Sequence, residues 1–381
     1  MKLAHVIPSF APAYGYGGPV VWAEQLTSAL EGRGHKVRIL TTDADGRNHV
    51  LSVEKNRWLP HCSGASVMYC PRQLPETLSL GLLRRLPEAV RWADVVMVSS
   101  VFSPLVIPAL LTCKVVDRPV LLFPHGSLMK GNLAGHRLRK RLWLRLITSI
   151  RLRRLVLAVA SELEGDDAGG LIGKVSVRMI PLGTTVPPSI RGQNKREDNL
   201  RLLFLGRLHP IKGLENLLRA CKLLDLSCQR NWVLRIAGSG EPSYSRGIQK
   251  LSIDLGLRDR VEFLGRVSRG MLCDLFAQSD LTVVPSYSEN FGHTVVESLA
   301  HAVPVIVSDG TPWKRVEEIG CGIMCSNSPE ELAKAIQRVS GLDLRSMGER
   351  GREWMKSEFS WSQCAKCVED ACCALLNSEG L

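Results

Sequence analysis

The chain has 381 residues, of which 45% are hydrophobic and 23% charged, and its formal net charge is +12. At about 150 residues per domain this length predicts two domains, and the composition excludes a chain that is disordered throughout. Nine basic residues and no acidic one lie between residues 130 and 154, so the charge is a local patch, not the general basicity typical of nucleic-acid-binding proteins.

The chain shows no segment for export or for crossing a membrane. His5 and Pro8 interrupt the apolar start before it reaches the length of a signal sequence. No window approaches the roughly 18 apolar residues that a spanning helix needs. We therefore expect a cytoplasmic protein with reduced cysteines. The pair Cys364 and Cys367 lies in a helical pattern, without the strands and turns of a zinc ribbon, and we expect no metal there.

The first half of the chain alternates β-rich apolar runs with helical patterns, as βαβ units do. An apolar stripe at helical spacing follows the first run and ends near Gly34. The expected strands are residues 2–7, 37–41, 66–70, 94–98, 119–123, 155–160 and 177–181. This pattern predicts a Rossmann-like N-terminal domain over residues 1–188.

A glycine-rich loop follows the first expected strand. Gly17 and Gly18 stand directly before a helix, where backbone amides can approach a phosphate. The dinucleotide fingerprint G-x-G-x-x-G is not completed, because Val20 and Val21 stand where its third glycine is needed, which disfavours an NAD enzyme. A plain tight turn is the alternative interpretation.

Two later strand ends of this domain also carry polar residues. Asp43 and Asp45 resemble an Asp-x-Asp metal motif, but such pairs are common in turns, and we expect no metal at them. His125 follows the strand at 119–123, where an imidazole can orient a substrate hydroxyl or phosphate. A histidine that is merely packed or solvated is the alternative.

The basic patch is predicted to be an amphipathic helix over residues 137–150. Its cations would face away from a broad apolar side made of Leu138, Leu142, Trp143, Leu146, Ile147 and Ile150. Such a helix favours binding to anionic lipid, so we expect an anionic membrane surface as a partner of Lys130 to Arg154, on the inner face of the plasma membrane. A domain helix that buries the same apolar side in its own core is the alternative.

Residues 189–199 are polar and lack apolar periodicity, which predicts a linker. After it the alternation restarts, with strands expected at 201–205, 233–237, 261–264, 281–284 and 304–307. A second Rossmann-like domain is expected over residues 200–358, and a closing helix within 359–381 should pack back on the N-terminal domain. The predicted fold class is α/β, with two doubly wound domains facing each other across a cleft.

Two loops of the second domain carry the strongest chemical signals. Arg207 and Lys212 lie between a strand and a helix, and one planar and one compact cation suit the two phosphates of a diphosphate. Glu289 and Glu297 flank a glycine-containing turn that leads into a helix, and two such carboxylates can hold sugar hydroxyls at the two ends of one ligand. An exposed basic turn and ordinary helix-dipole partners are the alternatives.

The Gly-Gly loop, the His-Gly strand end, the Arg-to-Lys loop and the Glu-x₇-Glu segment, in this order, resemble the family 4 retaining glycosyltransferases of the GT-B fold. The resemblance extends over nearly the whole chain. It implies catalytic positions at His125 and Glu289. It implies a site for a nucleoside-diphosphate-sugar donor formed by Gly17, Gly18, Arg207, Lys212, Val267, Asn290, Phe291, Gly292, His293 and Glu297.

Within that implied site, Arg207 and Lys212 would neutralise the leaving diphosphate, Glu289 and the amides after it would hold the sugar, Glu297 would bind the ribose, and the backbone at Val267 would contact the base. Glycosyl transfer develops negative charge on the leaving phosphate, which cations stabilise. Because no carboxylate is a clear nucleophile, we expect same-face attack in which the leaving phosphate takes the acceptor's proton, with no metal or other cofactor.

The tetrapeptide from Gly310 to Trp313 is shared with related sequences that serve bacterial surface polysaccharides, so we expect a glycan or lipid-linked acceptor in exopolysaccharide or lipopolysaccharide biosynthesis. A sugar-nucleotide epimerase or a phosphorylase of the same fold remains an alternative. A nucleic-acid-binding protein is a further one, although Trp143 is the only aromatic residue of the basic patch, and we expect no nucleic acid as a partner.

Overall fold

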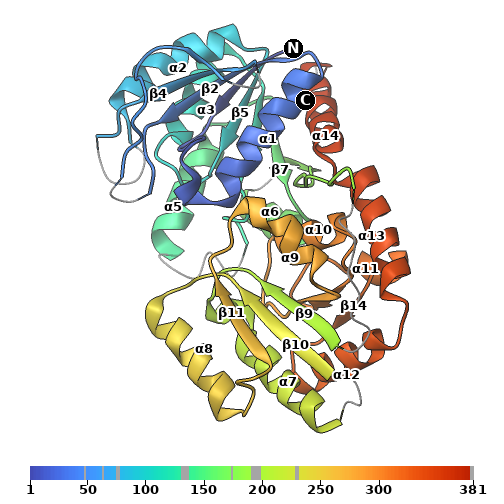
Figure 1. Cartoon of the computed structure of the whole chain (residues 1–381). Helices are drawn as coiled ribbons and strands as arrows, with labels where there is room; N and C mark the ends of the chain where they lie inside the picture. The colour runs from blue at the N-terminus through green and yellow to red at the C-terminus, as the bar shows by residue number, and fades with distance from the viewer. Residues whose placement is uncertain are drawn as a thin grey trace. The chain divides into compact units, whose positions relative to one another are not determined.

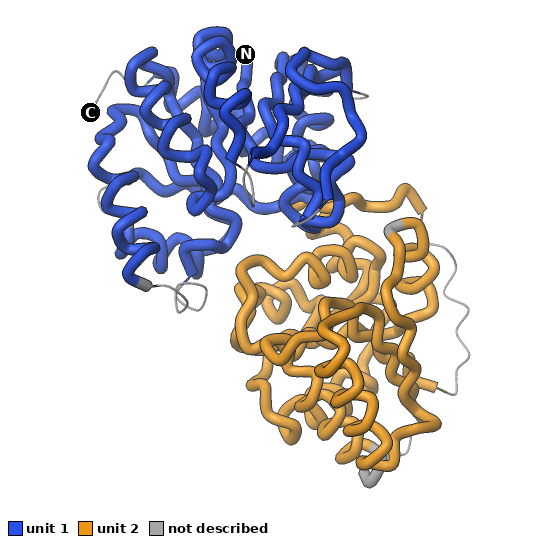
Figure 2. The backbone as a smooth tube through the Cα atoms, turned by 90° about the vertical axis from the view of Figure 1, so that its left-hand side faces the viewer, with its two compact units in different colours: residues 1–183, 361–381 blue, residues 184–360 orange. Residues whose placement is uncertain are grey.

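The structure is a computed structural model that describes residues 1–46, 49–61, 64–73, 78–129, 137–172, 175–189, 199–227 and 231–377. The chain divides into two compact units, residues 1–183 with 361–381 and residues 184–360 (Figure 2). Each unit holds a parallel sheet with helices packed on it, so the predicted α/β class with two Rossmann-like units is confirmed.

The division between the units lies earlier than residue 188, where the N-terminal domain was expected to end. Thr184 pairs with Ser360, and its N–H donates to the carbonyl of Phe359 at 2.7 Å, so residues 184–188 belong to unit 2. Of the expected linker, residues 190–198 lie outside the described residues. The last helix, expected to pack on the N-terminal domain, belongs to unit 1.

Unit 1 is built on a sheet with the strand order β3-β4-β2-β1-β5-β6-β7-β8 (Figure 1). The strands are β1 (Lys2–Val6), β2 (Lys36–Thr42), β3 (Leu59–Pro60), β4 (Ser66–Cys70), β5 (Val95–Ser99), β6 (Val120–Phe123), β7 (Leu155–Val159) and β8 (Ser176–Met179). Apart from β3, which pairs antiparallel with β4, neighbouring strands are parallel. The order reverses between β1 and β5, and such a switch point opens a crevice at the carboxyl ends of the strands.

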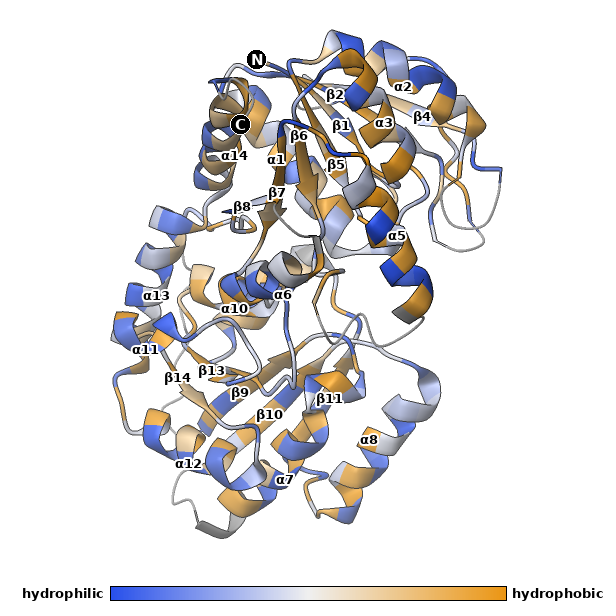
Figure 3. Cartoon of the chain, turned by 180° about the vertical axis from the view of Figure 1, so that it is seen from behind, coloured by the Kyte–Doolittle hydropathy of each residue, from blue (hydrophilic) through white to orange (hydrophobic). Residues whose placement is uncertain are grey.

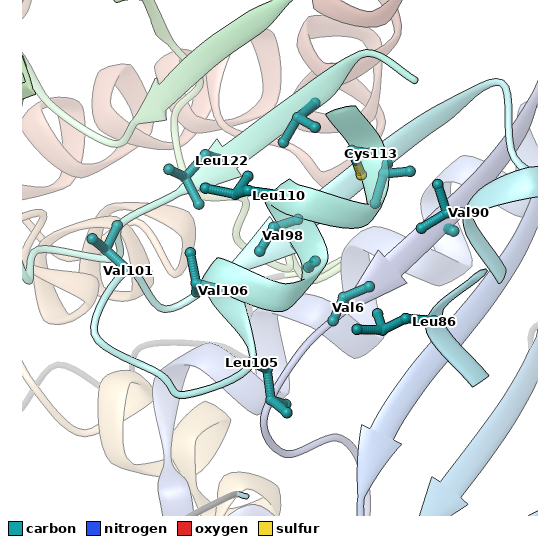
Figure 4. Packing of buried hydrophobic residues seen from close by; sticks show 14 of the residues in the cluster. Val6, Leu86, Val90, Val98, Val101, Leu105, Val106, Leu110, Cys113 and Leu122 are labelled. Carbon is teal, nitrogen blue, oxygen red and sulfur yellow. The ribbon is translucent and has the colours of Figure 1, made fainter. Parts of the chain in front are cut away.

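Helices cover both faces of this sheet. They are α1 (Gly18–Gly32), α2 (Leu80–Trp92), α3 (Val106–Val116), α5 (Arg137–Ser149), α6 (Glu162–Ile172) and α14 (Trp361–Asn377), with a short 3-10 turn η1 (Tyr14–Tyr16). Val98 and Leu122 of the sheet pack with Val106 and Leu110 of α3 in a fully buried cluster (Figure 4). On the other face α14 lies beside α1 (Figure 1) and against β5, β6 and β7. The α1 end is tied to α14 by an ion pair between Arg33 and Glu369.

Unit 2 is built on a parallel sheet of order β11-β10-β9-β12-β13-β14. Its strands are β9 (Asn199–Leu205), β10 (Asn231–Ala237), β11 (Val261–Gly265), β12 (Leu281–Val284), β13 (Val305–Ser308) and β14 (Gly322–Cys325). Its helices are α7 (Leu214–Ser227), α8 (Pro242–Asp254), α9 (Leu272–Ala277), α10 (His293–Ala300), α11 (Arg315–Ile319), α12 (Pro329–Ser340) and α13 (Leu344–Glu358), with 3-10 turns η2 (Pro210–Lys212) and η3 (Arg269–Met271). The strand order reverses between β9 and β12, which places the loops after these two strands at the switch point.

Candidate functional site

Unit 1 carries a cavity of about 740 Å³ at the carboxyl ends of its central strands. The cavity wall is formed by the loops after β1, β5 and β6 and by the start of α1. Its lining residues are Ile7, Pro8, Ser9, Tyr16, Pro19, Val20, Ser100, Phe102, Ser103, Pro124, His125 and Ser127. The wall is largely apolar with a few hydroxyls and one imidazole, a composition typical of small-molecule sites.

His125 is held at this wall by an unusual backbone turn. His125 and Gly126 both have positive φ angles, 51° and 79°, a conformation that costs a non-glycine residue roughly 1 to 2 kcal/mol. The turn is fixed from behind by Glu164, which is fully buried. Its carboxylate accepts the N–H of Gly126 and, at 2.8 Å, the N–H of Ala160. A buried side chain that accepts two backbone N–H groups is a positioning element, because strained turns persist only where the surroundings determine them.

The imidazole of His125 belongs to a buried chain of polar groups. Its Nε2 lies 3.0 Å from the hydroxyl of Ser99 at the end of β5, and the same hydroxyl lies 2.9 Å from Nε2 of His5 in β1. The ring of Trp22 packs edge-on against both imidazoles, with centroids 4.7 Å from His125 and 6.0 Å from His5. Burial, with a smaller contribution from His125, lowers the pKa of His5 to about 3, so His5 is neutral.

Gly17 and Gly18 lie at the start of α1 as expected for an amide-presenting loop. Gly17 has a φ of 73°, and a Cβ added there would meet nothing within 4 Å. The loop is exposed on the side of the helix N-terminus, where a helix dipole favours an anion.

Asp43, the first residue of the Asp-x-Asp pair, has a structural role. Asp43 is buried, with Lys55 Nζ 2.7 Å from its Oδ2 and the N–H of Arg72 2.8 Å from its Oδ1. Among the described residues, no three histidine, cysteine or acidic side chains gather into a cluster that could hold a metal ion. Asp43 therefore anchors the loop after β2 through its own protein partners.

In unit 2, the loops after β9 and β12 meet through a charge pair. Lys212 Nζ lies 2.5 Å from Glu289 Oε1, which also accepts the hydroxyl of Ser286 at 2.8 Å. The side chains of Lys212 and Glu289 are 22% and 13% exposed. The two residues that were expected to contact different parts of a ligand therefore form an ion pair with each other.

The loop after β9 is held by close backbone approaches. A Cβ on Gly213, whose φ is 65°, would lie 1.9 Å from the carbonyl oxygen of Pro285, so only glycine allows the two loops to touch. On the other side, the N–H of Leu208 donates to the carbonyl of Ser239 at 3.0 Å. Arg207, between these anchors, is exposed and makes no ion pair with any residue that the structure describes. Its guanidinium is thus available for an anion from solution.

The turn before α10 is supported from below by aromatic rings. The indole N–H of Trp313 donates to the carbonyl of Phe291, and the two rings lie 5.3 Å apart. Gly292 has a φ of 82° and forms the N-cap of α10, with exposed His293 as its first residue. The last residue of the Gly310–Trp313 tetrapeptide thus has a structural role, because its indole holds the turn that leads into α10.

The remaining expected donor residues lie on neighbouring elements. Glu297 is half-buried in the second turn of α10, and Asn290 is half-buried in the turn before it. Val267 follows β11 and packs, half-buried, on a small cluster that contains Phe276. The structure thus brings Lys212, Glu289 and the 290–293 turn to the switch point, whereas Val267 lies beyond β11 at the sheet edge.

The helix predicted from the basic patch is α5, and its apolar side was wrongly assigned. Trp143 is half-buried and its indole N–H donates to the carbonyl of Val101 at 2.7 Å. Ile147, Ile150 and the unexpected Leu144 are buried in the core of unit 1. Leu138, Leu142 and Leu146 are instead 73%, 51% and 54% exposed. The predicted apolar side is therefore only partly buried: one part packs into the core of unit 1 and the other part is exposed.

The exposed leucines of α5 form a ridge, which we call the leucine ridge, at i, i+4 and i+8. Arg139, Arg141 and Arg145 flank it, are also exposed, and pair with no acid among the described residues. Figure 3 shows hydrophobic and hydrophilic segments alternating along α5. Residues 130–136 of the basic patch lie outside the described residues. Across the described ranges no helix has the length and apolarity needed to span a bilayer.

Several residues of these sites had no place in the sequence interpretation. The sequence offered a weak signal for His5, whose polar side chain interrupts a buried apolar strand. It offered none for Ser99 or Glu164, because a serine after a strand and an acid in the first turn of a helix are ordinary.

Comparison with known families matches both units. Residues 17–183 match the family described as "Glycosyl transferase 4-like domain", and residues 187–354 match "Glycosyl transferases group 1". Among solved structures, sucrose-phosphate synthase from Thermosynechococcus elongatus has a TM-score of 0.74 at 21% identity, with both chains covered fully. HepE of Anabaena in complex with UDP has a TM-score of 0.75 at 17% identity, over 98% of this chain and 100% of that one.

Curated relatives match over part of their length. The D-inositol 3-phosphate glycosyltransferase of Streptomyces griseus is 32% identical over 193 residues, which is 48% of this chain and 40% of the relative. The GDP-mannose:cellobiosyl-diphosphopolyprenol alpha-mannosyltransferase of Xanthomonas campestris is 27% identical over 240 residues, 62% of this chain and 61% of that one. The chain thus matches less than half the length of the first of these relatives and under two thirds of the second.

Proposed function

The chain belongs to the glycosyltransferases of the GT-B fold, and on this premise we propose that it transfers a sugar from a nucleoside-diphosphate-sugar to a glycan or lipid-linked acceptor, with retention of the anomeric configuration. The observation that carries the proposal is the Lys212–Glu289 pair at the switch point of unit 2, whose lysine shares the loop after β9 with the exposed cation Arg207. Two cations such as Arg207 and Lys212 suit the two phosphates of a diphosphate, and a carboxylate such as that of Glu289 can accept hydrogen bonds from sugar hydroxyls.

In the proposed reaction Arg207 and Lys212 stabilise the negative charge that develops on the leaving diphosphate. Glu289 orients Lys212 in the free protein and receives a sugar hydroxyl when the donor is bound. The amides of the 290–293 turn, Glu297 and the backbone at Val267 hold the rest of the donor. The acceptor hydroxyl attacks on the face that the diphosphate leaves, and a phosphate oxygen takes its proton.

The relatives support this class of substrate. HepE was solved with UDP, and the Xanthomonas relative is named for a GDP-mannose donor and a diphosphopolyprenol acceptor. We propose that the cavity of unit 1, with His125 at its wall as a catalytic residue, takes the acceptor side. We further propose a role in bacterial surface-polysaccharide synthesis in the cytoplasm, at the inner face of the plasma membrane.

The donor site is tested by thermal shift against a panel of nucleoside diphosphates and their sugars, since a ligand of the native state raises its melting temperature. With the donor so identified, Arg207→Ala and Lys212→Ala should each lower turnover by about a hundredfold or more. Arg246→Ala, an exposed arginine on α8, is the matched control. Near-native activity of both variants would overturn the placement of the diphosphate.

The mechanism is tested by the configuration of the product, read by NMR coupling at the new anomeric carbon. Retention and activity that survives EDTA are expected, because protein cations stabilise the leaving group. An inverted product, or activity lost to EDTA and restored by manganese, would contradict the mechanism. Interconversion of the donor without any acceptor would instead reveal an epimerase, and a strict requirement for inorganic phosphate a phosphorylase.

The membrane partner is supported by the leucine ridge and its arginines, which have no protein partner among the described residues. Apolar side chains flanked by cations suit insertion at an anionic surface. Sedimentation with phosphatidylglycerol vesicles should show binding that weakens with salt. The triple change Leu138→Gln, Leu142→Gln, Leu146→Gln should abolish it, whereas Leu111→Gln with Val115→Gln, two exposed apolar residues of α3, should not. Equal binding to neutral vesicles, or no binding at low salt, would exclude this partner.

A further inference from the structure

The hydroxyl of Ser99 sits between two imidazole nitrogens, at 2.9 Å from His5 Nε2 and 3.0 Å from His125 Nε2. A hydroxyl has one hydrogen to donate and can accept hydrogen bonds from others. When it donates to one imidazole it must accept from the other, if both contacts are hydrogen bonds. The protonation of the two rings is therefore linked through a single oxygen atom.

The surroundings of His5 determine which imidazole donates a hydrogen bond to Ser99 and which one accepts a hydrogen bond from it. His5 is fully buried, and its Nδ1 has no hydrogen-bond partner among the residues that the structure describes. A neutral imidazole carries one N–H, and orphaned buried N–H groups are rarer in proteins than underused acceptors. The proton of His5 is thus favoured on Nε2, where it donates to Ser99. An N–H on Nδ1 would instead be buried without an acceptor, at a cost that the Nε2 tautomer avoids.

We propose that His5, acting through Ser99, fixes His125 as the tautomer that is protonated on Nδ1. Ser99 accepts from His5 and uses its own hydrogen to donate to His125 Nε2, which leaves Nδ1 as the donor nitrogen of His125. This is the tautomer that a neutral histidine favours less in water. The packing of Trp22 against both rings, at 4.7 and 6.0 Å, keeps the two imidazoles in place.

The link makes His5 and Ser99 positioning residues, and this role rests on the proposed function of His125 at the cavity wall. A donor nitrogen suits an oxygen acceptor such as a sugar hydroxyl or a phosphate oxygen. The opposite tautomer would present a lone pair at Nδ1, which repels a phosphate oxygen and can only accept a hydrogen bond from a hydroxyl. The buried His5, which does not itself contact a substrate, would in this way determine whether Nδ1 of His125 donates or accepts a hydrogen bond.

The tautomers are read directly from long-range ¹H–¹⁵N correlation spectra of the full-length protein labelled with ¹⁵N-histidine. Loss of signals in His125→Gln and in a His5 variant assigns the two rings. We expect a protonated Nδ1 for His125 and a protonated Nε2 for His5. A His125 protonated on Nε2 in the native protein would overturn the proposal. The tautomers are read in the native protein, and the variants serve only to assign its signals.

Variants then test the relay. Ser99→Ala should return His125 to an Nε2–H or mixed tautomer. His5→Gln, whose amide N–H can stand in for Nε2–H, should keep the native tautomer, whereas His5→Phe should lose it. An unchanged His125 spectrum in Ser99→Ala would overturn the relay. Because no donor or acceptor is added, these spectra stand even if the proposed transferase activity fails. If that activity holds, kcat should fall at least about tenfold in Ser99→Ala and recover in His5→Gln relative to His5→Phe.

Discussion

Replacement of Glu289 by glutamine keeps the shape of the side chain and removes its charge. The carboxylate lies 2.5 Å from Lys212 Nζ in a pair that is mostly buried. A phosphate that reaches Lys212 comes within a few ångströms of this carboxylate. Two unit charges about 4 Å apart interact by roughly 1 kcal/mol in bulk water and about 4 kcal/mol near a protein surface, so the carboxylate opposes a free nucleoside diphosphate by an amount in this range.

We therefore expect Glu289→Gln to bind the free nucleoside diphosphate at least about fivefold more tightly, which corresponds to the lower bound of about 1 kcal/mol. Turnover of the complete donor should fall about a hundredfold, because the sugar loses its carboxylate. Isothermal titration calorimetry measures the first effect and steady-state kinetics the second.

The matched control is Glu331→Gln, which removes an exposed carboxylate paired with Lys334 on α12. It should change neither quantity, since an exposed pair contributes little. Unchanged or weaker affinity of Glu289→Gln for the nucleoside diphosphate would refute the idea that carboxylate and phosphate compete for Lys212.

Three further substitutions probe the supports of the two sites. Trp313→Phe leaves the buried carbonyl of Phe291 without its donor and should destabilise unit 2 by about 1 to 3 kcal/mol in differential scanning calorimetry; no loss would contradict the support assigned to the indole. Glu164→Gln sets an amide NH₂ against a backbone donor and should speed hydrogen exchange at residues 125–127 in mass spectrometry, and unchanged exchange would count against its positioning role. Gly213→Ala should weaken donor binding at least about tenfold by separating the two loops of unit 2, whereas Gly247→Ala on α8, where a Cβ meets nothing, should not; equal affinities would exclude the contact as a requirement.

Much of the fold could be predicted from the sequence because most of its strands are largely buried runs rich in β-branched residues and leucine, which is typical of parallel sheets. Two strands were not expected. β3 has only two residues, too few to show a period, and β14 begins with a glycine, which is unfavourable in strands. Both are edge strands of sheets whose other strands already define the core.

The candidate site was less accessible from sequence, since it depends on which strands are neighbours. His5, Ser99 and His125 come from β1, from the end of β5 and from the turn after β6, and only the strand order brings their side chains within hydrogen-bonding distance. The helical period of α5 correctly indicated an amphipathic helix. It could not show that the core of unit 1 covers only the side with Leu144 and Ile147 and leaves Leu138 exposed.

Unit 1 is made of two segments that are far apart in the sequence, and this affects the order in which its parts are synthesised. A ribosome releases residues 1–183 first, then the whole of unit 2, and only last the helix α14 that covers β5, β6 and β7. Domains usually fold in the order in which they emerge. Here the unit that is translated second is complete in sequence before the first one is. Nascent unit 1 must therefore keep the apolar surface beside α1 exposed while unit 2 is still being made, and a chain cut short before Trp361 would never cover it.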